Sequence, residues 1–397
     1  MLTVQTILAE NFINFERIRK LTMEQLKAAY RIIHCRTEAM GGHVEACPEG
    51  HYRRVRYNSC KHRTCAMCAA TKIEEWIEKK KSQLLATKHY HVIFTIPHEL
   101  NELWMINTKV MAELLFNSAW DVLQSMMENE DFLGAIPGVL ATLQTWGETM
   151  SLHPHIHMLV TGGGADKAGK WRKSKDNYLL PVKTLMKLFR ARYIRLLQKE
   201  TYQAKIKPPE GMSYKEIQDL LRTLKEKDWN VFIGKEYSYG EGVAIYLGRY
   251  VRGGPISNKR LKSYQDKEVE FYYDDNHEKD PNKKRKVMKI SAEEFIRRLL
   301  MHVPPENFKT VRTYGIYASS KRKELNQCRK EFAQKSYEEI IEDFKGSTWL
   351  EDLIEEQNQC PKCGKKLEVI ERIPFGGRRE RAGPEGLGEN VLEQKWV

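Results

Sequence analysis

The segment Ser151-Leu-His-Pro-His-Ile-His-Met-Leu-Val160 carries the sharpest structural signal in the chain. Its alternation of polar and apolar residues predicts a β-strand, in which successive side chains point to opposite faces. His155 and His157 therefore project together, whereas Ile156 points to the other face and into the core. Two imidazoles side by side on a rigid strand are half of a site for Mg²⁺, Mn²⁺ or Zn²⁺.

A cation held in this way needs a third ligand from elsewhere in the chain. Glu148 and Gln144, which lie just upstream, are the candidates, and the sequence does not choose between them. A bound cation would polarise a phosphate oxygen and fix its orientation. The competing interpretation is that the histidines are only surface or hydrogen-bonded residues. His153 on the same face and the glycines that follow make the metal interpretation equally strong.

The segments around this strand predict an α+β fold. Periodicity of two with β-branched and aromatic residues predicts strands at 89–97, 139–146, 155–161 and 309–317, and a hairpin at 268–273 and 286–290. Gly162-Gly-Gly164 predicts a turn that ends the histidine strand. Periodicity near 3.6 predicts helices at 4–34, 71–86, 99–127, 182–199, 213–227, 240–252 and 291–302.

A pair of tyrosines is the second chemical signal. Tyr246 and Tyr250 are four residues apart, so on a helix they lie on one face, and Arg249 and Arg252 flank them. A phenol has a pKa near 10, so it needs a polarised phosphate to act as a nucleophile at neutral pH. Two tyrosines permit two successive transesterifications, and each arginine can hold a phosphate. Core packing is the commoner role of such a pair taken alone.

The cysteines predict structural zinc. Five of the eight lie between Cys35 and Cys68, and this spacing in a cytosolic protein favours metal over disulfides. Potential ligands come in two closely spaced sets separated by a spacer, an order typical of a closed zinc site. They offer five ligands for four places: Cys47, His51, Cys60, Cys65 and Cys68. The preferred set is Cys47, His51, Cys65 and Cys68, with Cys60 as the substitute for His51.

The remaining cysteines and the basic residues carry weaker signals. Cys360-Pro-Lys-Cys363 is half a zinc knuckle with no convincing second pair, and Cys35 and Cys328 are expected to be buried or free thiols. Basic residues interleaved with the first cysteines predict DNA contact by this module, namely Arg53, Arg54, Arg56 and Arg63.

Charge and composition favour a nucleic-acid partner. The 397 residues include 66 Lys and Arg against 53 Asp and Glu, a net charge of +13 that attracts phosphates. No apolar run approaches the roughly 20 residues that span a bilayer, and the N-terminus does not resemble a secretory signal. We therefore expect a cytoplasmic, nucleoid-associated protein with no membrane role. The sequence does not indicate its oligomeric state.

Four longer motifs resemble those of a known family, the two-tyrosine rolling-circle transposases typified by insertion sequence ninety-one. The similarity covers roughly residues 1–370, in that family's order. The motifs are Tyr57-Asn-Ser-Cys-Lys-His-Arg-Thr-Cys-Ala-Met-Cys68, Phe94-Thr-Ile-Pro-His-Glu-Leu100, Thr145-Trp-Gly-Glu-Thr-Met-Ser-Leu-His-Pro-His-Ile-His157 and Tyr246-Leu-Gly-Arg-Tyr-Val-Arg-Gly-Gly-Pro-Ile-Ser257.

The resemblance implies an HUH endonuclease domain, with a central antiparallel sheet and flanking helices, preceded by helical and zinc-binding modules. It implies nicking and rejoining of single-stranded DNA at the ends of a mobile element and at its target, through 5′-phosphotyrosine intermediates. The family's metal-binding pair falls on His155 and His157, with Mg²⁺ or Mn²⁺ as the cation, and its nucleophiles fall on Tyr246 and Tyr250. Gln144 stands where many relatives have histidine.

Together these signals predict five segments: a helical segment at 1–40, a zinc-binding module at 41–88, the HUH domain at 89–320, a helical segment with the CxxC pair at 321–373 and a disordered tail at 374–397. Two alternatives stay open. A replication initiator or relaxase would use the same chemistry, and a non-catalytic zinc-bearing protein would only bind DNA.

Overall fold

The computed structural model describes residues 2–69, 73–175, 177–239, 241–248, 254–345, 358–376 and 380–381. It forms two compact units, Met1–Ala29 with Arg63–Gly346 and Tyr30–His62 with Ser347–Val397. The fold is mixed α+β with antiparallel sheets, as the sequence predicts. Among the helices of these described ranges, none is both long enough and apolar enough to cross a membrane.

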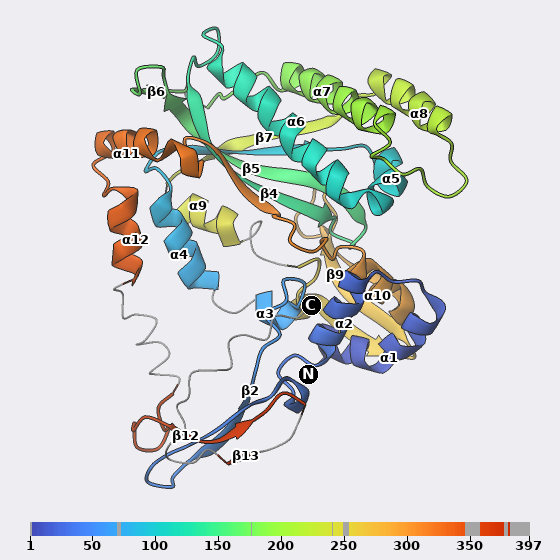
Figure 1. Cartoon of the computed structure of the whole chain (residues 1–397), viewed down its shortest axis with the longest axis vertical. Helices are drawn as coiled ribbons and strands as arrows, with labels where there is room; N and C mark the ends of the chain where they lie inside the picture. The colour runs from blue at the N-terminus through green and yellow to red at the C-terminus, as the bar shows by residue number, and fades with distance from the viewer. Residues whose placement is uncertain are drawn as a thin grey trace. The chain divides into compact units, whose positions relative to one another are not determined.

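A six-stranded antiparallel sheet is the centre of the first unit (Figure 1). Its order is β11-β4-β5-β3-β7, with the short β6 paired to β5. The strands are β3 (His89–Thr95), β4 (Ile136–Trp146), β5 (Leu152–Ala165), β6 (Trp171–Lys173), β7 (Asn230–Tyr237) and β11 (Val311–Gly315). The long β4 and β5 are buried along most of their length, because both faces of the sheet are covered.

Helices on one face of the sheet bury the main apolar core. Ile156, Met158 and Val160 of β5 point toward them, as the alternating pattern predicts. Figure 1 shows the long α6 and α7 lying along this face. The helices of this layer are α5 (Asn101–Ile106), α6 (Thr108–Glu128), α7 (Val182–Tyr202) and α8 (Tyr214–Glu226).

The opposite face of the sheet carries the histidines and has its own cover. There Leu140 and Leu159 pack with Val243, Tyr246 and other buried side chains in a second apolar cluster. The helices on this side are α4 (Ile73–Gln83), α9 (Glu241–Tyr246), α11 (Arg322–Glu331) and α12 (Tyr337–Lys345). The tyrosine helix therefore lies against the histidine face.

A second, three-stranded sheet completes the first unit. Its order is β10-β9-β8, formed by β8 (Leu261–Gln265), β9 (Glu268–Asp274) and β10 (Arg285–Ser291). The predicted hairpin between β9 and β10 is confirmed. The strongly amphipathic α10 (Ala292–Leu300) follows, begins at an N-cap made by Ser291, and packs against α1 (Val4–Ile18).

Three predictions about element bounds are wrong. The expected helix 4–34 is divided into α1 and α2 (Met23–Ile33), because the backbone at Arg19 is extended. The expected helix 99–127 is likewise divided, at Asn107, into α5 and α6. The glycines at 162–164 do not end the strand, since β5 continues to Ala165. A Cβ on Gly164 would lie 2.5 Å from the carbonyl oxygen of Ile136, so glycine here permits neighbouring strands to approach closely.

The second unit is built from both ends of the chain. Its sheet has the order β13-β12-β1-β2 and is formed by β1 (Gly42–Ala46), β2 (Arg53–Tyr57), β12 (Glu368–Ile373) and β13 (Glu380–Arg381). The pairing of β1 with β12 brings together residues more than 320 positions apart in the sequence. Most of the tail predicted from 374 lies outside the described residues.

Candidate active site and metal centres

His155 and His157 lie on one face of β5, as the period of two predicts. Their Nε2 atoms are 2.9 Å apart, and both side chains are buried. The pairing of β5 with β4 places Gln144 directly opposite His155, and the Gln144 Oε1 atom lies 3.2 Å from the Nε2 of His157. Three side chains from two strands therefore converge on one point.

The hydrogen bonds of His155 show which atom it presents to that point. Its Nδ1 lies 2.6 Å from the carbonyl oxygen of His153, which can only accept, so the Nδ1–H donates. The Nε2 of the neutral ring then carries a lone pair that faces His157. Two nitrogens 2.9 Å apart suit a shared cation with octahedral geometry, because ligands bound at about 2.1 Å and at right angles lie about 3 Å apart.

Burial keeps these rings neutral, which metal binding requires. Loss of solvation on burial lowers the pKa of His155 from its ordinary value to about 4. It also lowers the pKa of His157, and the neighbouring His155 and His91 lower it further. Both rings are therefore neutral at neutral pH. A cation can bind them without first displacing a proton.

His91 belongs to this site, and the sequence interpretation missed it. Its Nε2 lies 2.7 Å from the Nδ1 of His157, with the two rings stacked at 4.9 Å between centroids. If the Nδ1–H of His157 donates to His91, the Nε2 of His157 is left for a cation. The signal was His89-Tyr-His91 on the predicted strand, but only the register of β3 against β5 places His91 beside His157.

The two candidate third ligands differ in position. Gln144 contributes an amide oxygen to the point where the imidazoles meet. Glu148 is half exposed, and its carboxylate lies 3.8 Å from the guanidinium of Arg260. In the part of the chain that the structure describes, Glu148 joins no group of three potential His, Cys or acidic ligands within 4.8 Å of one another. The geometry favours Gln144.

Tyr246 lies next to the histidines. Its ring meets that of His91 edge-on, with 5.3 Å between the centroids, and the side chain is fully buried. The predicted helix 240–252 begins as α9, and its later part lies outside the described residues. Tyr250, Arg249 and Arg252 are among the residues not described.

The cysteine group that lies within one unit differs from the predicted one. Cys47 and His51 lie with Cys360 and Cys363, and their ligand atoms are all within 4.8 Å of one another. In the same unit, the backbone N–H of Cys60 donates to the Cys35 Sγ at 3.4 Å. The preferred set of Cys47, His51, Cys65 and Cys68 is therefore wrong, and so is the expectation that Cys360-Pro-Lys-Cys363 has no second pair.

The Cys47 group has the spacing of a zinc site. The Cys47 Sγ lies 3.5 Å from the Cys363 Sγ and 4.0 Å from the His51 Nδ1. Two thiolates bound to zinc at about 2.3 Å in a tetrahedron lie about 3.7 Å apart.

The predicted DNA-contacting arginines have partners within the second unit. Arg54 and Arg56 both contact the buried carboxylate of Glu45, at 2.5 and 3.4 Å. Arg53 lies 3.4 Å from Glu371. These pairs give the three arginines a structural role, and DNA contact by them stays a prediction. Arg63 instead belongs to the first unit and lines a pocket there.

Two family models match the chain. Residues 7–96 match a model described as a transposase zinc-binding domain, and residues 138–324 match one described as a putative transposase. The first match and the Cys47 group together support structural zinc. One model thus describes a domain of transposases and the other a transposase, an enzyme of DNA transposition.

Two curated relatives match over most of their length. The chain is 33% identical over 360 residues to the putative transposase y4qJ of Sinorhizobium fredii, covering 86% of this chain and 88% of the relative. It is 25% identical over 300 residues to the transposase for insertion sequence element IS801 of Pseudomonas savastanoi pv. phaseolicola, covering 74% and 70%. No solved structure matches. The chain belongs to the transposase family typified by insertion sequence ninety-one.

Proposed function

We propose that this transposase nicks and rejoins single-stranded DNA at the ends of its mobile element, using an HUH domain and tyrosine nucleophiles. The observation that carries the proposal is the convergence of His155, His157 and Gln144 on one point of the sheet, with Tyr246 packed against their neighbour His91. A central antiparallel sheet with helices on both faces agrees with the HUH assignment.

The chemistry divides between a cation and the chain. Mg²⁺ or Mn²⁺ bound by His155, His157 and Gln144 would supply polarisation of a phosphate oxygen. Tyr246 and Tyr250 attack the phosphorus through their phenolic oxygens. As each Oη–P bond forms, the P–O3′ bond breaks, the phenol loses its proton and the 3′ oxygen gains one. The products are a 5′-phosphotyrosine and a free 3′-OH, and the reverse step rejoins strands.

Tyr246 is covered in the conformation described, so DNA must displace part of its surroundings. Its side chain is fully buried in the cluster beneath α9. We infer that binding of the DNA strand opens this side of the sheet.

The decisive experiment is incubation with labelled single-stranded DNA from the element's own ends, with and without Mg²⁺ or Mn²⁺, followed by a denaturing gel. We expect a metal-dependent covalent adduct that is lost in the Tyr246→Phe/Tyr250→Phe variant. Each single variant should bind DNA nearly normally and block a different strand-transfer step. Unchanged DNA under all conditions would favour the non-catalytic DNA-binding alternative, and activity only on a replication origin would favour an initiator or relaxase.

We further propose one structural zinc ion held by Cys47, His51, Cys360 and Cys363. Thiolates and imidazole in a closed set of four are typical of structural rather than catalytic zinc. The ion would join β1 and β12, which come from opposite ends of the chain.

A further inference from the structure

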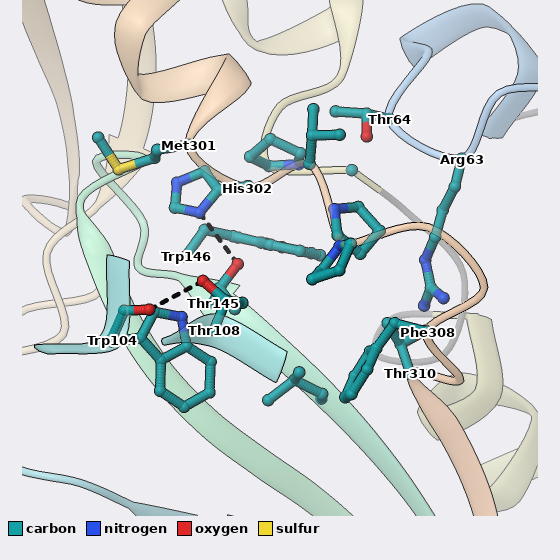
Figure 2. Close-up of a pocket in the computed structure, with 16 residues that line it drawn as sticks. Arg63, Thr64, Trp104, Thr108, Thr145, Trp146, Met301, His302, Phe308 and Thr310 are labelled. Carbon is teal, nitrogen blue, oxygen red and sulfur yellow. Dashed lines mark hydrogen bonds between the residues drawn. The ribbon is translucent and has the colours of Figure 1, made fainter. Parts of the chain in front are cut away.

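Thr142 of β4 faces the same side of the sheet as the histidines. Side chains alternate between the two faces along a strand. Leu140, two residues before Thr142, packs in the apolar cluster on the histidine face, whereas Leu143 packs in the main core on the other face. Figure 2 shows that other face, where Thr145 is hydrogen-bonded to His302 in a pocket. Thr142 therefore belongs to the face that carries the proposed cation site.

The register of the strands places Thr142 beside that site. In the pairing of β4 with β5, Thr142 is directly opposite His157, and Gln144 is two residues further along the same face. Residues directly opposite each other on one face of an antiparallel pair have Cβ atoms about 5 Å apart. The hydroxyl of Thr142 is therefore a close neighbour of two of the three groups that converge on one point.

The Thr142 hydroxyl is buried without a partner. The residue has an exposed fraction of 0%, and its Oγ1 makes no hydrogen bond with the described residues. A buried hydroxyl that lacks a partner destabilises a fold, and valine has nearly the same shape without this cost. Packing alone therefore does not account for threonine at this position. In a folded protein such a group indicates a water or an ion that supplies the partner.

The chemistry of the proposed cation identifies that partner. Mg²⁺ prefers octahedral coordination and usually keeps several of its waters. His155, His157 and Gln144 would occupy about half of an octahedral shell, which leaves positions for water and for a phosphate oxygen. A water on a cation donates strong hydrogen bonds, and a threonine oxygen accepts them. The Thr142 Oγ1 makes no hydrogen bond with His157 or Gln144, as expected of a group that acts through an intervening water.

We propose that the Thr142 hydroxyl holds a water ligand of the cation and so helps to position the cation between His155, His157 and Gln144. The existence of the cation site rests on the proposed function. Thr142 accepts a hydrogen bond from the water, so it is a positioning residue that acts through the water rather than by touching DNA.

Titration of the full chain with Mn²⁺, with its zinc retained, tests the proposal. We expect Thr142→Val to weaken Mn²⁺ binding about 10- to 100-fold, the range for loss of a group that supports a metal ligand. The Tm should not fall, because valine keeps the shape and removes only an unpartnered hydroxyl. Thr142→Ser keeps the hydroxyl and should retain most of the affinity.

Thr310→Val is the matched control. Thr310 is 6% exposed and also has an unpartnered Oγ1 among the described residues. It lines the pocket of Figure 2 together with Leu143 and Thr145, on the face of β4 away from the histidines. The same substitution there should leave the Mn²⁺ affinity unchanged.

The outcomes separate this proposal from the proposed function. Equal Mn²⁺ affinity in Thr142→Val and the unsubstituted chain would overturn the role of Thr142, even if that chain forms a covalent adduct with DNA. A loss in Thr142→Ser as large as in Thr142→Val would also overturn it, because side-chain shape would then be the cause. A Mn²⁺ site that depends on Thr142 in a chain without adduct formation would support the role and count against the cleavage chemistry. Absence of Mn²⁺ binding to the unsubstituted chain would contradict both.

Discussion

A single side chain, His91, contacts the ring nitrogen of His157 that faces away from the other candidate ligands. It contacts the Nδ1 of His157 at 2.7 Å, which leaves the Nε2 directed at His155 and Gln144. Partners of this kind orient a ligand and raise its basicity, and their loss typically weakens metal binding by about 10- to 100-fold. His91 is thus a positioning residue in the proposed site.

We expect His91→Phe to weaken Mn²⁺ binding about 10- to 100-fold, because the ring of His157 loses its fixed orientation. Isothermal titration with Mn²⁺ measures this change. His98→Ala is the control, since that histidine is exposed and makes only a surface ion pair at 3.4 Å. Equal affinity in the His91 variant and the unsubstituted chain would remove His91 from the site.

The third ligand can be identified by the same titration. We expect Gln144→Ala to lower Mn²⁺ affinity about tenfold or more, because it removes an oxygen 3.2 Å from His157. Glu148→Gln should leave the affinity unchanged, since that carboxylate lies beside Arg260 instead. The opposite ranking of the two variants would assign the ligand to Glu148.

At the scale of elements, close approach of strands explains several glycines. Gly315 ends β11 with φ at +58°, and a Cβ there would lie 1.8 Å from the carbonyl oxygen of Pro137 on β4. Gly211 also has a positive φ, +80°, but a Cβ there would meet nothing within 4 Å. A substitution at Gly211 therefore adds only the strain of a positive φ, whereas a substitution at Gly315 also adds a clash with the carbonyl oxygen of Pro137.

We expect Gly315→Ala to lower the free energy of unfolding by more than about 3 kcal/mol, because β11 must separate from β4. Gly211→Ala should cost only about 1 kcal/mol, the strain of the left-handed backbone alone. Chemical denaturation measures both values. Similar costs at the two positions would show that contact between β11 and β4 does not limit residue 315.

His302 connects the segment after α10 to the β4–β5 turn and responds to pH. Burial lowers its pKa to about 4, and it contacts Thr145 and Met150. Because the folded-state pKa lies below the unfolded value near 6.5, its contribution to stability is complete above pH 6.5. The contribution is lost as the pH falls toward 4, since protonation favours the unfolded chain.

Between pH 7 and pH 5 we expect His302 to account for about 2 kcal/mol of lost stability. His302→Gln, which keeps a polar side chain but cannot be protonated, should lose less stability over that interval. Unfolding free energies of both proteins at the two pH values test this. Parallel pH profiles would show that His302 does not titrate on unfolding.

At the scale of the whole molecule, the net charge of +13 favours DNA binding that weakens as the salt concentration rises. A protein that contacts about six phosphates of a single strand should lose roughly 300-fold in affinity between 50 and 200 mM salt. We expect a loss of at least about 100-fold, measured as the Kd of an element-end oligonucleotide. A Kd that does not depend on salt would contradict a phosphate-dominated interface.

Zinc content tests the pairing of the chain's two ends. We expect Cys363→Ser to hold about one zinc ion per chain fewer than the unsubstituted chain by elemental analysis, because the Cys47 group then lacks a ligand. Cys328→Ser is the control. Burial raises the pKa of that thiol to about 11, and it lies outside the Cys47 group, so the zinc content should not fall. Equal zinc content in the Cys363 variant and the unsubstituted chain would contradict the assigned ligands.

The sequence by itself determined the features that depend on local pattern. The period of two placed His155 and His157 on one face of β5, and the period of 3.6 placed α7 and α8. Motif order identified the family. These features follow from residues within a few positions of one another, whose geometry the backbone sets directly.

Only the tertiary structure decided which distant residues meet. The register of β3 against β5 brought His91 to His157, and the pairing of β1 with β12 joined Cys47 to Cys363. The glycines after the histidine strand proved to be sites of close packing rather than a turn. Such contacts depend on strand register and on pairing between distant segments. A shift of one residue would turn every side chain of the strand to the other face of the sheet, and no local pattern encodes the register.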